Sequence, residues 1–266
     1  MKISGNNKIS DAGAFSVTSD ADAGQDIDDV LTADFSTAYT SAGTNTEFTI
    51  HKTFTTGIAC KYVAFSGHNL SDLSGGVSVV VKVNTVTKAT VTFGGGSPNW
   101  VTMVHFDEVT ATTVELIFTK TLADKATISY LAIGDTLDSA FSFPNQNVAP
   151  GGFPLSWRTR SSKIRSVIND AAQPVANIRQ QIARQTTLNL KNINVSAIQS
   201  AIWLEFLELV YAQGAFFLKD QDGTVLSDEP RSASMGFNVE VMPPKLSDQT
   251  RQLVDLSIKY SDFTGG

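Results

Sequence analysis

Apolar residues recur at every second position through much of the first half of the chain. The run 77–83 is the clearest case, and a similar period of two begins at Glu47. This period is that of a β-strand, in which successive side chains point to opposite faces. The positions that share one parity are Phe48, Ile50 and Phe54 in one run, and Val77, Val79, Val81 and Val83 in another. The run Tyr62–Phe65 differs, because it is apolar at both parities and predicts a strand with two buried faces.

Seven or eight short strands of this kind lie between residues 47 and 134, and no helical period separates them. Such spacing is typical of an antiparallel β-sandwich or jelly roll. The first fold prediction is therefore a mainly β chain with an N-terminal β-sandwich or jelly roll over residues 1–140. The stretch from Gly134 to Pro154 is rich in Pro and Gly and poor in periodic apolar positions, so residues 141–153 are predicted to be a linker.

The remaining residues, 154–266, predict a second β domain with one helix. Trp157–Ile168 and Ala176–Leu190 have the composition of long strands. The one expected helix is Ser196–Gln213, because Ser196 and Gln199 have the spacing of a capping box, apolar residues follow at helical intervals, and Gly214 comes next. The alternating run at 254–260 predicts a further strand.

Charge divides the chain unevenly. The formal net charge is −6, and all seven arginines lie after residue 150. Arginine suits fixed ion pairs and interfaces better than lysine does, so the second half is expected to make the lasting contacts. Compositional drift is the alternative explanation. Neither half is basic enough to predict sequence-specific nucleic-acid binding, and no apolar run is long enough to predict membrane insertion.

The residues that usually carry catalysis are scarce. The three histidines, His51, His68 and His105, lack the spacing of a metal site, and Cys60 has no second cysteine for a disulfide. Asp26–Asp29 could offer oxygen ligands to calcium but lacks the glycine and glutamate of a calcium loop, so a solvated acidic loop is expected. The sequence therefore predicts no catalytic, cofactor-binding or metal-binding residues and a protein that is not an enzyme.

Aromatic residues leave one binding function open. Trp100 with Phe93 and Phe106, or Tyr39 alone, could stack on sugar rings as exposed aromatics do in carbohydrate-binding modules. The alternative is that these side chains are part of the sandwich core.

Tyr62–Leu70, a strand ending in Gly-His-Asn-Leu, resembles a pattern in discoidin-like sandwich domains of bacteriophage virion proteins. In those domains the turn belongs to the scaffold. The resemblance implies that Gly67, His68 and Asn69 form a scaffold turn: glycine permits a sharp exit, asparagine tolerates a left-handed turn, and the histidine ties the loop to a neighbouring carbonyl.

The second half resembles the tail-tube fold of phage tail tube, distal tail and baseplate-hub proteins: two long strands, a helix, then a hairpin, here entered through Gly214–Phe217. Those domains form hexameric rings, or trimers of doubled domains, around a DNA channel. The resemblance implies a structural distal-tail or tail-tip protein, present in the virion and made in the host cytoplasm. In this chain the sandwich precedes the tube-like part. In the usual order of distal-tail proteins the tube-forming part comes first.

The expected partners are other copies of the chain, in a ring of six as the resemblance implies. Other phage tail proteins and a host-surface glycan are the further expected partners. The ring interface is predicted to include Arg158, Arg160, Arg179 and Arg184, placed in alternation on the first two strands of the second domain. Two other functions remain open: a carbohydrate-binding host-adhesion module, and a capsid or neck accessory protein.

Overall fold

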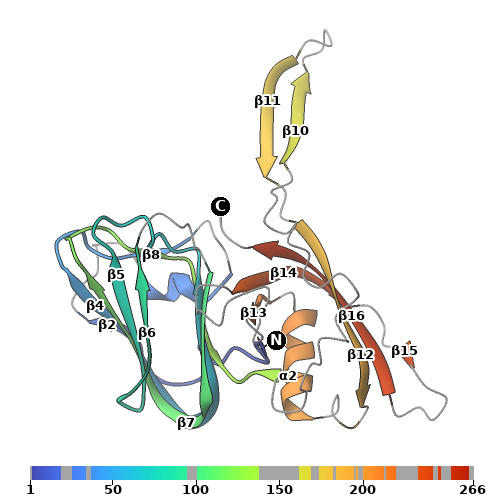
Figure 1. Ribbon diagram of the computed structural model, residues 1–266, viewed down its shortest axis with the longest axis horizontal. Coiled ribbons are helices and arrows are strands. Elements are labelled where there is room, and N and C mark those ends of the chain that lie inside the picture. Colours follow the sequence, from blue (N-terminus) through green and yellow to red (C-terminus); the bar gives the residue numbers. More distant parts are fainter. Residues whose placement is uncertain are drawn as a thin grey trace.

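The computed structural model describes residues 2–18, 26–33, 37–94, 101–137, 162–168, 174–181, 184–194, 196, 200–212, 214–219, 233–241, 245–246 and 253–263. Within these ranges the chain is mainly β, with an N-terminal β-sandwich and a second sheet that carries a helix (Figure 1). The prediction of a mainly β fold of this order is confirmed.

The sandwich is built around two long antiparallel strands, β4 (Glu47–Ser66) and β7 (Val101–Lys120). Their register shifts between Thr53 and Ile58, which divides each strand into two halves. The first half of β4 pairs with β2 (Phe15–Thr18), and the second half pairs with β9 (Tyr130–Gly134). The second half of β7 continues the sheet through β5 (Val77–Val83) to β6 (Val86–Phe93).

The predicted alternation supplies the sandwich core. Phe48, Ile50 and Phe54 lie in one buried cluster with the odd-numbered valines of β5. The rings of Phe48 and Phe118 stack with centroids 4.5 Å apart. Two short elements complete this unit: the strand pair β3 (Tyr39–Thr40) with β8 (Thr127–Ile128), and a 3-10 turn, η1 (Ile27–Val30). In η1 the predicted acidic loop is ordered, because the Asp26 side chain accepts a hydrogen bond from the backbone N–H of Asp28 at 3.0 Å.

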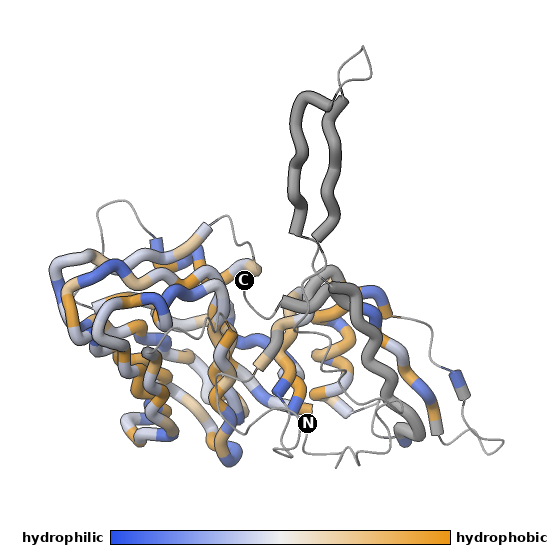
Figure 2. Tube along the Cα trace, turned by 45° about the horizontal axis from the view of Figure 1, so that its top comes forward, coloured by the Kyte–Doolittle hydropathy of each residue, from blue (hydrophilic) through white to orange (hydrophobic). Residues whose placement is uncertain are grey.

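The second sheet has the strand order β1-β13-β14-β16-β12, with β15 also paired to β16. Its strands are β1 (Lys2–Ile3), β12 (Arg184–Asn194), β13 (Phe216–Lys219), β14 (Ser234–Val241), β15 (Lys245–Leu246) and β16 (Leu253–Phe263). The helix α2 (Ala201–Tyr211) packs on one face, where Trp203, Phe206 and Val210 join a buried cluster with residues of β1, β13, β14 and β16. Figure 2 shows the hydrophobic colouring of α2 and the strands around it.

The helix and the long strands have other bounds than the sequence predicted. The described helix begins at Ala201, and Ser196, the expected first residue of the capping box, bonds to Asn194 instead. The expected strand 176–190 is divided into β11 (Pro174–Gln181) and β12, which belong to different sheets. β11 pairs with β10 (Ser162–Ile168) to form a separate two-stranded hairpin, which stands clear of both larger units in Figure 1.

The first strand of the chain lies in the second sheet. Lys2 and Ile3 pair with Lys219 and Leu218 of β13, and Ile3 belongs to the core under α2. The division into domains at 1–140, 141–153 and 154–266 stays a prediction, but residues 2–3 contribute to the sheet that follows the sandwich. No helix in the described ranges has the length and apolar character needed to cross a bilayer.

Candidate functional site

A continuous apolar junction joins the sandwich to the second sheet. Tyr62 and Ala64 of β4 lie in one buried cluster with Phe217 of β13 and Met235 of β14. The rings of Tyr130 and Phe217 stack with centroids 5.8 Å apart and an interplanar angle of 7°. This cluster explains the run that is apolar at both parities: Val63 and Phe65 face the sandwich core, and Tyr62 and Ala64 face the second sheet.

Both phenylalanines of the Gly214–Phe217 segment are fully buried, on opposite sides of the sheet. Phe216 packs edge-on against Phe206 of α2, with ring centroids 5.8 Å apart, and Phe217 packs against the sandwich. The second sheet is therefore covered by α2 on one face and by the sandwich on the other at β13.

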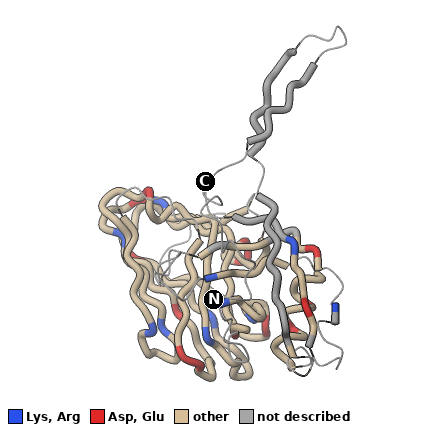
Figure 3. Tube along the Cα trace, turned by 45° about the vertical axis from the view of Figure 1, so that its right-hand side comes forward, with Lys and Arg blue, Asp and Glu red and all other residues tan. Residues whose placement is uncertain are grey.

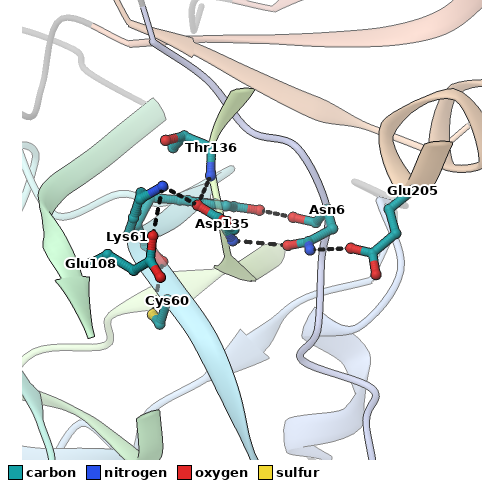
Figure 4. A network of polar contacts seen from close by, with 8 residues as sticks. Asn6, Cys60, Lys61, Glu108, Asp135, Thr136 and Glu205 are labelled. Carbon is teal, nitrogen blue, oxygen red and sulfur yellow. Dashed lines mark hydrogen bonds and ion pairs between the residues drawn. The ribbon is translucent and has the colours of Figure 1, made fainter. Parts of the chain in front are cut away.

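The N-terminal segment threads between the two units as a clasp, which we define as residues 4–8. Asn6 donates a hydrogen bond to the Glu205 carboxylate of α2, and its side-chain oxygen accepts from the backbone N–H of Asp135 at 2.8 Å (Figure 4). The Tyr62 hydroxyl donates to the carbonyl of Asn6, and Lys8 Nζ lies 3.1 Å from Glu205 Oε1. The clasp therefore connects β4, the end of β9 and α2.

The ionic groups of this network are shifted toward their charged forms. Burial alone would raise the pKa of Glu205, but hydrogen bonds from Asn6 and Lys8 lower it overall. Burial alone would lower the pKa of Lys61, but its contacts with Glu108 and Asp135, each 3.0 Å from Nζ, raise it. The arrangement is a network of ion pairs that stabilises the structure, in which each charged group has a partner of opposite sign.

The predicted scaffold turn lies at the end of β4. Gly67 has a φ of 64°, in the left-handed region that favours glycine. His68 is buried between the rings of Phe65 and Phe93, and its Nε2 lies 3.1 Å from Thr102 Oγ1, so its neighbour is a hydroxyl and not a backbone carbonyl. Asn69 bonds across the loop, donating to the carbonyl of Lys125 and accepting from the N–H of Thr127.

The four predicted interface arginines are not brought onto one surface by what the structure describes. Arg158 and Arg160 lie outside the described residues. Arg179 is in β11, opposite Ile164, and Arg184 is the first residue of β12, opposite Asp262. Arg179 and Arg184 thus belong to different sheets, because the chain leaves the hairpin before it enters β12. The expected strand 176–190 that would have held both is therefore two strands, and the assignment of the four arginines to a ring interface stays a prediction.

Three of the four aromatics considered for sugar stacking are in the sandwich core. Phe93, Phe106 and Tyr39 are 0%, 9% and 1% exposed, and Trp100 lies outside the described residues. A separate cavity of about 520 Å³ opens where β5, β6 and β7 end. Its rim carries the hydroxyl groups of Ser78, Thr92 and Thr119, which lie in one cross-strand row.

The groups that could support catalysis are dispersed. In the part of the chain that the structure describes, no three His, Cys, Asp or Glu side chains are grouped as a metal site. Burial raises the pKa of the Cys60 thiol to about 12, so the reactive thiolate is suppressed at neutral pH. His51 lies 3.7 Å from Glu115 on the outside of the sandwich, far along the sheet from His68.

Sequence reasoning missed most of the junction. The two-faced apolar run Tyr62–Phe65 was its one visible sign, and it could have indicated a second packing surface on β4. Asn6, Lys8 and Glu205 carry no such sign, because polar residues that meet across about 200 positions form no local pattern.

Comparisons with known proteins concern only the fold of the sandwich. Neither the protein-family models nor the curated proteins contain a match to the sequence. Among solved structures, a chitosan-binding module from a Paenibacillus chitosanase/glucanase, in complex with chitotriose, is similar over 48% of this chain and 99% of its own, with 16% identity and a TM-score of 0.39.

Two further solved structures are similar over about the same share of this chain. The lectin-binding domain of lectinolysin, complexed with Lewis b, matches 48% of this chain and 95% of its own, with 12% identity and a TM-score of 0.38. A Ruminococcus gnavus fucosidase in complex with fucose matches 49% of this chain at 9% identity and a TM-score of 0.41. This chain spans only 27% of the fucosidase. At these identities and TM-scores the similarities concern the β-sandwich fold alone and do not bear on a phage tail.

Proposed function

We propose that this protein is a non-enzymatic structural component of a phage tail, near its distal end, and that it assembles into a ring around the DNA channel through its second β unit. The observation that carries this proposal is the edge strand β12. It has 11 residues and, among the described strands, pairs on one side only, with β16. The opposite edge of the same sheet is the two-residue strand β1, which pairs with β13.

The middle of β12 lacks the charges and prolines that keep edge strands apart, and its register shift against β16 lies near its end, between Leu190 and Ile193. From Gln185 to Leu190 it has no charged residue and no proline, and Arg184 and Lys191 lie only beyond the ends of this run. Monomeric proteins usually protect such edges with charges, prolines or bulges, since an open edge pairs with other chains. A head-to-tail ring would cover this edge in every subunit, because β12 of each copy would pair with a different surface of the next copy.

The rigid junction supports the same proposal. A buried apolar cluster and the clasp fix the sandwich to the second sheet, so a ring built by the second unit would carry the sandwiches in one defined orientation. The element order of the second unit, with long strands before the helix and β13 after it, agrees with the resemblance to tail-tube domains. A hexamer is the proposed stoichiometry.

The test is the oligomeric state of the full chain, measured by light scattering after size-exclusion chromatography. We expect wild type to form a closed oligomer, and the double variant Arg179→Glu, Arg184→Glu to shift toward the 28.5-kDa chain. The matched control, Lys82→Glu with Lys88→Glu in the sandwich, should leave the oligomer intact. A wild-type chain that stays monomeric at high concentration, alone and with other tail proteins, would overturn the proposal.

A second candidate function is carbohydrate binding by the sandwich, and the cavity at the ends of β5, β6 and β7 favours it. The residues that line the cavity are of two kinds, apolar ones such as Leu73 and Val77 and the hydroxyl-bearing Ser78, Thr92 and Thr119. Its volume of about 520 Å³ is within the range of small-ligand sites. Sugars present both apolar faces and hydroxyl groups, so the two kinds of lining are complementary to them.

Titration calorimetry with chitotriose and with fucose tests this candidate. Binding that is lost in Thr92→Lys, where a long side chain would fill the rim, supports a site in the cavity. The same substitution at Thr90, on the same strand but outside the cavity lining, is the control. Equal heats for buffer and for both sugars would exclude these ligands.

A further inference from the structure

Lys61 lies between two carboxylates that come from neighbouring strands. Its Nζ atom is 3.0 Å from Asp135 Oδ1, directly after β9, and 3.0 Å from Glu108 Oε2 of β7 (Figure 4). The strand that carries Lys61, β4, pairs with β7 and with β9. Charged positions are sparse over the described chain (Figure 3), and this lysine is in contact with two of the carboxylates at once.

The amine and one of the two carboxylates are shielded from water. The side chains of Lys61 and Asp135 are 10% and 14% exposed, whereas that of Glu108 is 59% exposed. The pair Lys8–Glu205, at a similar distance of 3.1 Å, is 27% and 37% exposed. Exclusion of water from a reacting pair protects a bond whose competing reaction is hydrolysis. Lys61 and Asp135 are therefore the pair in which a condensation product would last.

Hydrogen bonds hold Asp135 in place. Its backbone N–H donates to Asn6 Oδ1 at 2.8 Å, and its carbonyl accepts from the N–H of Gly5 at 2.7 Å. Its side-chain Oδ1 accepts from the N–H of Thr136 at 2.7 Å. A fixed donor at this oxygen stabilises the negative charge that develops there when a nucleophile adds to the carboxyl carbon. The carboxyl group is thus positioned beside Lys61 and has a donor for its oxygen.

We propose that Lys61 and Asp135 become joined by an amide bond between their side chains, with Glu108 as the group that transfers protons. Nζ attacks the carboxyl carbon of Asp135, so a C–N bond forms and the C–Oδ2 bond breaks. Glu108 carries two protons in turn from Nζ to Oδ2, which leaves as water. Oδ1 becomes the amide oxygen and keeps its hydrogen bond from Thr136. An ammonium and a carboxylate together contain the atoms of an amide and one water, so no other reactant is needed.

The ion pair is the state from which the bond forms. Both carboxylates raise the pKa of Lys61, so the ammonium must first give a proton to Glu108, which lies within hydrogen-bonding distance. Well-oriented groups in one molecule react as if their concentration were about 10⁵–10⁸ M, which offsets the small population of the neutral amine. Glu108 is the less suitable partner for the bond itself, because its exposed carboxylate stays hydrated.

The bond would change how the sandwich resists unfolding. It would join β4 covalently to the residue after β9, and it would close a loop over residues 61–135 that persists in the unfolded chain. Because Asp135 also bonds to Asn6 and Gly5, the clasp would be attached to a covalently closed part of the sandwich. The inference does not depend on the proposed ring or on sugar binding.

Mass spectrometry of the full wild-type chain tests the bond. The mass should be lower than that of the sequence by one water molecule. Trypsin does not cleave after a lysine whose amine is acylated, so the peptide 53–82 should remain intact and be joined to the peptide 126–158. A link to the peptide 89–120, which contains Glu108, would overturn the assignment to Asp135. A full sequence mass after prolonged incubation at neutral pH would overturn the proposal altogether.

Three variants separate the bond from the ion pair. Lys61→Arg keeps a positive charge between the carboxylates but has no amine to acylate, so its mass should be that of its full sequence. Glu108→Gln keeps the size of the side chain and removes the proton transfer, so the linked fraction at equal times after synthesis should fall at least tenfold. Lys8→Arg is the matched control, since Lys8 also pairs with a carboxylate, and it should show the loss of water seen in wild type.

The variants also show which part of the proposal is wrong if it fails. Loss of water that persists in Lys61→Arg would place the reaction at other residues and overturn the Lys61–Asp135 bond. A linked fraction in Glu108→Gln equal to that of wild type would contradict the role of Glu108. The circular-dichroism spectrum of each variant should match that of wild type, which shows that a missing bond does not result from a missing fold.

Discussion

Acidification should destabilise the fold through His68. Burial between Phe65 and Phe93 lowers the pKa of this side chain to about 3, from the ordinary histidine value of 6.5. The folded state therefore favours the neutral imidazole, whereas the unfolded chain takes up a proton below about pH 6.5. The stability is fully present above that pH and is lost as the pH falls from about 6.5 toward 3.

The size of the loss follows from the two pKa values. Each pH unit inside this window removes about 1.4 kcal/mol from the free energy of unfolding. From about pH 7 to about pH 5 the His68 contribution is about 2 kcal/mol, and over the whole window it is about 5 kcal/mol.

Urea unfolding at the two pH values, followed by circular dichroism, measures this loss. His68→Gln keeps a hydrogen-bonding group near Thr102 Oγ1 and removes the titration. The wild type should lose about 2 kcal/mol more than His68→Gln between about pH 7 and about pH 5. If the free energy of unfolding falls by the same amount in wild type and in His68→Gln on acidification, protonation of His68 does not destabilise the fold and the prediction is refuted.

Three further predictions concern the junction and the turn. Phe217→Ala should cost about 3–5 kcal/mol in urea unfolding because it empties a fully buried site against Tyr130, whereas a loss below 1 kcal/mol would contradict the packing. Asn6→Ala should cost about 1–3 kcal/mol and speed amide hydrogen exchange in the first turn of α2; unchanged exchange would argue against the clasp. Gly67→Ala should cost about 1–2 kcal/mol because φ is 64°, and an unchanged melting temperature would be inconsistent with that geometry.

Periodicity predicted the sandwich well because its strands bury one face each. The alternating valines of β5 all lie in the core, and so do Phe48, Ile50 and Phe54. The signal is local, since every second residue meets the same environment. The lengths of β4 and β7, 20 residues each, were not predicted, because a strand that bends and joins two sheet layers changes its buried face at the bend.

The candidate site was much harder to predict, because its contacts are long-range. β1 has two residues and no period, and it becomes a strand only because β13 supplies its partner. The division between β11 and β12 also has no local mark, since Gln181 and Arg184 are as compatible with one continuous strand as with two. The function prediction rested on resemblance, and the ring, its six copies and its place in a virion remain proposals.

The position of β1 has a consequence for synthesis of the chain on the ribosome. Its partner β13 lies about 215 residues downstream, so the N-terminal residues emerge long before the strand that they pair with. At about 5–20 residues per second this interval is on the order of ten to forty seconds. From the completion of β9 at Gly134 until β13 is made, the sandwich surface with Tyr62, Ala64 and Tyr130 lacks Phe217 and Met235 to cover it. The nascent chain therefore presents an apolar surface that a chaperone can bind, and its release should coincide with synthesis of β13 and β14.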